Sequence, residues 1–129
     1  MSNGNGEQVR LTLPATPHLL RVARLTAAGL ASRLGFNLDE VEDVKIAVDE
    51  LCFAMVGSRG REGNLTLVYH LHDTTLVIEG ASDFPEPISG PVTGDLSAQI
   101  LAALVDDYEM SATDGTMRFR LTKRRGAPS

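Results

Sequence analysis

The stretch NLDEVEDVKIAVDELCFAMVG, residues 37–57, decides the fold because it predicts a long, capped amphipathic helix. Asn37 is a suitable N-cap, and Glu40 three residues later completes a variant of the capping box. Gly57 is placed to end the helix. Apolar residues recur at three- and four-residue spacing and form one face; these are Val41, Val44, Val48, Leu51 and Met55.

Glu50 has an unexpected position on this helix. At helical spacing its neighbours are Ile46, Ala47 and Ala54, so the acid flanks the apolar stripe. A boundary glutamate that reaches solvent fits this position, and so does a carboxylate held at the mouth of a pocket. The helix by itself leaves both interpretations open.

The composition predicts a single domain in a reducing cytoplasm. The 129 residues suffice for one hydrophobic core, which we expect over 9–124, with a disordered tail at 1–8 and a second tail at 125–129. No apolar run approaches the ~20 residues of a membrane span, and the polar N-terminus lacks a signal-peptide pattern. Cys52 is the sole cysteine, which excludes an internal disulfide. The net charge of −5 argues against nucleic acid as a direct partner.

The order of elements predicts an α+β fold. Hairpin-linked strands outnumber those that a parallel sheet with crossovers needs, so we expect a two-layer sandwich. Its mostly antiparallel sheet of about five strands is covered on one face by three helices. The expected strands are 9–13, 65–72, 76–81, 108–112 and 116–123, and the helices are 17–34, 37–56 and one from Asp95 or Ser97 to Leu104.

Few residues carry recognisable chemistry. His70 and His72 share one face of a strand, but no acid or cysteine is expected beside both, so an exposed polar face is favoured over a metal site. The chain lacks a Walker loop, a G-x-S-x-G elbow and an H-E-x-x-H helix. The remaining candidates are Glu50, the long irregular loop 83–95, and the helix that follows this loop.

Three segments carry a family resemblance: VKIAVDELCFAM at 44–55, DLSAQILAALVDDYEM at 95–110, and GTMRFRLTK at 115–123. Together with the order of elements, they resemble bacterial anti-sigma factors of the serine-kinase type. The resemblance covers 9–124, nearly the whole chain. It implies the Bergerat-type ATPase fold that these factors share with histidine kinases, gyrase B and Hsp90.

The resemblance implies a regulator of transcription. Such a factor binds and sequesters a sigma factor, is countered by an anti-anti-sigma protein, and forms a homodimer. The alternative is an active ATP-dependent serine kinase that phosphorylates the anti-anti-sigma protein, and a third reading is a degenerate scaffold with another partner. Glu50 matches the family's catalytic base toward the partner serine, and the family's partner-contact arginine falls on Arg24, with Arg21 on the same helix.

The family's nucleotide motifs are altered around the magnesium and the phosphates. The asparagine that supplies the magnesium ligand in the family is Ala54 here, and a methyl group offers no oxygen. The turn that wraps the phosphates falls on Asp95 and Ser97. A carboxylate at a helix N-terminus occupies the place where phosphate would bind.

The adenine motif is altered as well. The family's D-x-G-x-G falls on residues 79–83, where Glu79 keeps an acceptor while Ala81 and Asp83 replace both glycines. Thr116 keeps the family's threonine in the last hairpin. The resemblance thus implies ATP and Mg²⁺ as cofactors of a divergent branch, whereas the residues at most motif positions work against their binding.

Overall fold

Residues 6–85 and 94–126 are described by a computed structural model of the chain. Within them the chain forms five strands, three α-helices and one short 3₁₀ helix, in an α+β arrangement that confirms the predicted fold. The elements in order are β1 (Glu7–Pro14), η1 (Pro17–Leu19), α1 (Leu20–Arg33), α2 (Leu38–Val56), β2 (Asn64–His72), β3 (Thr75–Asp83), α3 (Asp95–Leu104), β4 (Asp107–Thr113) and β5 (Thr116–Arg124).

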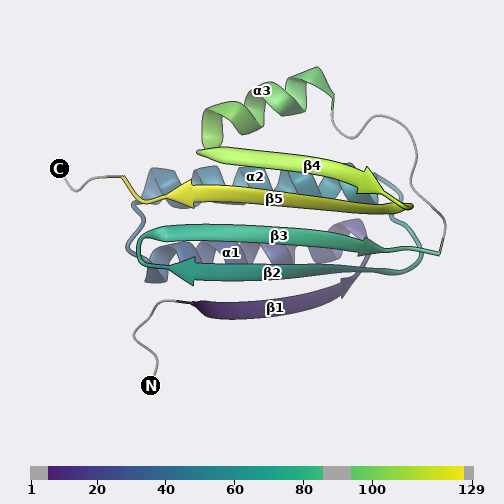
Figure 1. The fold of residues 1–129 in the computed structure, drawn as a ribbon, viewed down its shortest axis with the longest axis horizontal. Helices are drawn as coiled ribbons and strands as arrows, with labels where there is room; N and C mark the ends of the chain where they lie inside the picture. Colours follow the sequence, from purple (N-terminus) through teal and green to yellow (C-terminus); the bar gives the residue numbers. More distant parts are fainter. Residues whose placement is uncertain (1–5, 86–93, 127–129) are drawn as a thin grey trace.

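The five strands form one antiparallel sheet in the order β1-β2-β3-β5-β4. Tight turns join β2 to β3 and β4 to β5, as expected from the sequence. Asp73 and Asp114 adopt positive φ in these turns, which aspartate tolerates better than most residues, and Gly115 follows with φ 79°. Figure 1 shows α1 and α2 behind the sheet, with α3 beside the β4 edge.

The core lies between the sheet and the helices. Side chains alternate along each strand, so every second residue of β2, β3 and β5 faces the helices and is buried. Tyr69 is fully buried on β2, and its hydroxyl donates a hydrogen bond of 2.9 Å to the backbone oxygen of Ala23 on α1. Among the described residues no helix is long and apolar enough to cross a membrane.

The capping box at the start of α2 is confirmed. The side chain of Asn37 accepts from the backbone N–H of Glu40, and the carboxylate of Glu40 accepts from the backbone N–H of Asn37. The first expected helix instead begins with the 3₁₀ turn η1, where Thr16 makes no side-chain cap bond. Parts of the expected tails and of the loop 83–95 (residues 1–5, 86–93 and 127–129) lie outside the described residues.

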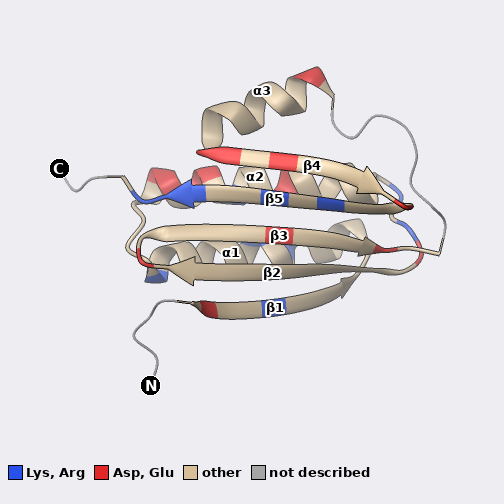
Figure 2. Cartoon of the chain, viewed as in Figure 1, with Lys and Arg blue, Asp and Glu red and all other residues tan. Residues whose placement is uncertain are grey.

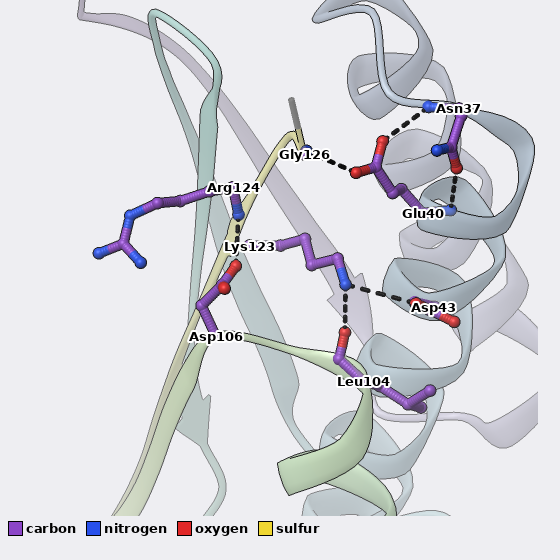
Figure 3. A network of polar contacts seen from close by, with 8 residues as sticks. All are labelled: Asn37, Glu40, Asp43, Leu104, Asp106, Lys123, Arg124 and Gly126. Atoms are coloured by element: carbon purple, nitrogen blue, oxygen red, sulfur yellow. Dashed lines mark hydrogen bonds and ion pairs between the residues drawn. The ribbon is translucent and has the colours of Figure 1, made fainter. Parts of the chain in front are cut away.

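Polar contacts fasten the C-terminal end of β5 to the helices (Figure 3). The second carboxylate oxygen of Glu40 accepts from the backbone N–H of Gly126 at 2.6 Å, so one side chain caps α2 and holds the chain end. Lys123 donates to the backbone oxygen of Leu104, at the C-terminus of α3, and to Asp43 on α2, at 2.6 and 3.3 Å. Lys123 thereby joins β5, α2 and α3.

Candidate functional site

Arg21, Arg24 and Glu50 line one cleft between the start of α1 and the second half of α2. The cleft has a volume of about 470 Å³, and Asp49 and Phe53 of α2 also line it. The sequence predicted two arginines for partner binding and one carboxylate for catalysis from separate segments. The structure brings all three side chains to the same surface.

An ion pair crosses this cleft. Arg24 donates from Nη1 to Oδ2 of Asp49 at 2.9 Å, and both side chains remain partly exposed. Asp49 is one of several acids on this helix, and no local sequence pattern distinguishes it from the others. Its contact joins residues 25 positions apart on two helices, so only the packing of α1 against α2 reveals it.

Glu50 also contacts the first turn of α3. The hydroxyl of Ser97 donates to Oε1 of Glu50 at 3.3 Å, which brings together two residues that the family motifs predicted for one pocket. Asp95 is exposed in this turn, and Gly94 is the N-cap without a side-chain cap bond. The carboxylate of Glu50 is therefore placed to accept a hydrogen bond from a serine hydroxyl.

The residues predicted for the adenine motif lie on the side of the sheet opposite to the helices and to Glu50. Alternation along β3 buries Ile78, Gly80 and Ser82 toward the helices, so Glu79, Ala81 and Asp83 belong to the helix-free face of the sheet. Glu79 and Ala81 line a concavity of about 460 Å³ on that face. Figure 2 views this face and shows the acid on β3 between basic residues on β1 and β5.

On the helix-free face, Glu79 contacts His70, and it does not lie beside Glu50. Its Oε1 lies 2.8 Å from Nε2 of His70 on the neighbouring strand β2. These two strands pair directly, so the acid lies close to one of the two histidines that the sequence placed on an exposed strand face. The predicted nucleotide residues are thus divided between the two faces of the sheet.

The side of β3 that faces the helices carries Ser82, which the sequence did not single out. Its hydroxyl accepts a hydrogen bond of 2.9 Å from the backbone N–H of Met117 on β5, one residue after Thr116.

Ala54 is half-buried on α2, one turn after Glu50, and its methyl group supplies no metal ligand. Among the predicted nucleotide positions, Ala54 is therefore the one that lacks the oxygen of the family's asparagine.

Cys52 has no chemical role that the structure supports. Its thiol is fully buried on α2, and burial, with the nearby charge of Asp49, raises the pKa of the thiol well above its usual range. A thiol that stays protonated and inaccessible is a poor nucleophile and metal ligand. Cys52 is a small core residue.

No family model matches the chain. Among curated proteins, the serine-protein kinase RsbW of Halalkalibacterium halodurans is 32% identical, over 86% of this chain and 80% of the relative. The serine-protein kinase RsbW of Bacillus cereus strain B4264 is also 32% identical, over 91% of this chain and 84% of the relative. Identity of this level over most of both chains establishes membership of the same family.

A solved structure supports the same assignment at the level of fold. It contains the RsbU and RsbW domains of a Mycobacterium tuberculosis protein, and it matches 92% of this chain with a TM-score of 0.70 at 18% identity. This chain spans 32% of that solved chain, so the likeness concerns one part of it. By its sequence relatives and its fold, the chain belongs to the RsbW family of serine-protein kinases, the anti-sigma family that its sequence resembles.

Proposed function

We propose that this chain acts chiefly by sequestration: it binds a sigma factor, forms a homodimer, and is countered by an anti-anti-sigma protein. The observation that carries the proposal is the cleft in which Arg21, Arg24 and Glu50 lie together. An exposed arginine with spare N–H donors is suited to recognise a carboxylate on a partner protein. The shared cleft and its arginines support this surface as the partner-binding site.

We further propose that binding of ATP with Mg²⁺ is weakened or lost in this chain. Ala54 removes the hard oxygen ligand, and Asp95 brings a negative charge to the first turn of α3, where a phosphate would need the helix N-terminus. Glu79 and Asp83 belong to the helix-free face, so they add no acceptor beside Glu50. These arguments support sequestration over phosphotransfer.

Co-purification tests the proposed binding. The chain is produced with each sigma factor of its host, and we expect one stable complex that weakens on Arg24→Ala. Arg33→Ala is a matched control, because Arg33 also lies on α1 and pairs with Glu7, outside the cleft. If none of the sigma factors forms a complex with the wild-type chain, the proposal is wrong.

The alternative is an active serine kinase that phosphorylates the anti-anti-sigma protein. It is favoured by the contact between Glu50 and the hydroxyl of Ser97, because a carboxylate in hydrogen-bond reach of a serine is what a general base requires. Calorimetry with ATP and Mg²⁺ separates the alternatives, and sequestration predicts little or no heat. Transfer of radiolabelled phosphate that is abolished by Glu50→Gln would establish the kinase instead.

Ala54→Asn provides a further test of the pocket. The amide oxygen restores the type of ligand that Mg²⁺ prefers. If the remaining pocket admits phosphate, nucleotide affinity rises in this variant. If the affinity stays at the wild-type level, the other altered positions are enough to exclude the nucleotide.

A further inference from the structure

The helix α3 is apolar on more sides than the fold buries. Its sequence is DLSAQILAAL, with one charged and two polar residues. A helix that is apolar on all sides is normally buried. All ten residues of α3 are described, yet Leu101 is the one among them that is buried, and Leu96 is 70% exposed.

The apolar residues on the outer side of α3 form a stripe. Leu96, Ile100 and Ala103 follow one another at intervals of four and three residues, so they lie along one side of the helix. Leu101 and Ser97 lie on the side that faces the core and α2, where the hydroxyl of Ser97 donates to Glu50. Apolar residues at i, i+4 and i+7 are the pattern through which one helix contacts another.

The net charge of the chain is concentrated around this helix. The chain has 17 acidic residues and 12 Lys and Arg residues. Residues 94–117, which contain α3, β4 and the turn to β5, include five of these acids and no Lys, Arg or His. The rest of the chain has equal numbers of both, so this segment accounts for the whole net charge of −5.

Two of these acids flank the stripe. Asp95 is exposed at the first residue of α3, and Asp106 is exposed shortly after its last residue. Among the side chains that the structure describes, neither carboxylate pairs with a Lys or Arg. Asp106 accepts one hydrogen bond, from the backbone N–H of Arg124. The helix between the two acids is about 15 Å long at 1.5 Å per residue.

The basic residues of the neighbouring strand β5 do not face the stripe. Lys123 is 14% exposed and directs its ammonium group inward, to Asp43 and the backbone oxygen of Leu104. Alternation along β5 turns Arg118, Arg120 and Arg124 to the helix-free face. Figure 3 shows the side chain of Arg124 pointing away from the helices. The outer side of α3 therefore offers apolar contacts between two free carboxylates.

We propose that the outer side of α3 receives a basic amphipathic helix of the sigma factor. Apolar residues of this helix contact Leu96, Ile100 and Ala103, and a Lys or Arg at each end binds Asp95 and Asp106. This rests on the proposed function, and it adds a second contact surface to the cleft between α1 and α2. The two surfaces are continuous, because Ser97 in the first turn of α3 contacts Glu50, which lines the cleft.

A sigma factor has the chemistry that this surface requires. A protein that binds promoter DNA carries Lys and Arg on the helices that approach the phosphates. Carboxylates placed around an apolar stripe attract the same side chains and accelerate association at low salt. Docking on α3 therefore covers part of the surface that the sigma factor uses for DNA.

A substitution on the stripe tests the apolar contact. The sigma factor that co-purifies with the wild-type chain is titrated into Leu96→Gln, with Leu38→Gln on α2 as the matched control. Both leucines are highly exposed, so the variants are expected to fold, and circular dichroism checks this. We expect a loss of affinity of about tenfold or more for Leu96→Gln, as for a truncated anchor of an interface, and wild-type affinity for Leu38→Gln.

The salt dependence of binding tests the charged contact. Asp95→Asn and Glu62→Gln each remove one exposed carboxylate, the first on α3 and the second in the loop before β2. We expect Asp95→Asn to slow association at low salt and to make the affinity less sensitive to salt, while Glu62→Gln behaves as the wild type. An equal effect of both variants would assign the attraction to overall charge and contradict a contact at Asp95.

The outcomes separate this inference from the proposed function. If the sigma factor binds the wild-type chain, and binds Leu96→Gln and Asp95→Asn equally well, α3 is not a docking site, although sequestration stands. If these variants lose only the anti-anti-sigma protein, or turn a dimer into a monomer, α3 has another occupant and the inference is overturned. If no sigma factor binds the wild-type chain, the proposed function fails and this inference fails with it.

Discussion

Replacing Lys123 by methionine should destabilise the protein more than any exposed ion pair would suggest. Lys123 is only 14% exposed, and its ammonium group donates to the backbone oxygen of Leu104 and to Asp43 (Figure 3). The oxygen of Leu104 belongs to the last turn of α3, where a cation also interacts favourably with the helix dipole. Methionine keeps the apolar stem and removes only the charge and the donors.

The two lost contacts set the size of the effect. A hydrogen bond to a charged group contributes about 1.5–3 kcal/mol to stability. The pair with Asp43 is partly exposed, so it adds only about 0.2–1 kcal/mol. Since methionine packs at least as well as the lysine stem, we expect the free energy of unfolding to fall by about 2 kcal/mol. For a domain of this length, that lowers Tm by roughly 6–10 °C.

Urea denaturation measures the change, with Lys45→Met as the matched control. Lys45 pairs with Glu42 three residues away on the surface of α2, so its loss should cost no more than about 0.5 kcal/mol. Amide hydrogen exchange should become faster in α3 before the rest of the chain, because α3 loses its fastening to β5. A loss for Lys123→Met no larger than for Lys45→Met would refute this account of the network.

Three further outcomes follow from the buried contacts and the capping box. Tyr69→Phe removes the hydrogen bond to Ala23 without changing the ring, and should lower the unfolding free energy by about 1 kcal/mol in urea denaturation. Gly80→Ala places a methyl group against the ring of Phe119, and overpacking of this kind should cost about 1–3 kcal/mol by the same measurement; an unchanged stability would show that the ring can move aside. Two backbone N–H donors, of Asn37 and Gly126, lower the pKa of Glu40 below its usual value, so its carboxylate stabilises the fold at neutral pH and this contribution is lost as the pH falls through the lowered pKa. The difference in stability between the wild type and Glu40→Gln should therefore be largest at neutral pH and disappear in acid, and a difference that does not change with pH would contradict this.

The sequence predicts best where the signal is local. The helix at 37–57 carries its cap, its apolar period and its stop signal within 21 letters, and the structure confirms α2 with Asn37 as N-cap and Gly57 as C-cap. The turn at Asp114 and Gly115 is likewise local, because one Asp-Gly dipeptide determines it, and both residues adopt positive φ. Contacts between distant segments carry no such signal, and the ion pair from Arg24 to Asp49 is the clearest case.

At the adenine motif, the positions taken from the family comparison conflict with the two-residue alternation of side chains along β3. Leu76 and Ile78 are apolar and face the helices, so the alternation of a strand already assigns Glu79 to the opposite face. Residues at the motif spacing therefore do not share the side of Glu50. Ser82, between Ala81 and Asp83, is the residue of this motif whose hydroxyl faces the helices, on the same side of the sheet as Glu50. The sequence did not single it out.

The geometry of α2 separates the position of the altered nucleotide motif from the cleft proposed for partner binding. Successive residues of a helix point about 100° apart, so Asp49, Glu50 and Leu51 serve three different neighbours: α1, α3 and the core. Phe53 is one turn beyond Asp49 and lines the same cleft, whereas Ala54 is one turn beyond Glu50. Ala54 therefore lies outside the cleft that Arg24, Asp49 and Phe53 line, so a change at the position of the family's magnesium ligand leaves the lining of this cleft as it is.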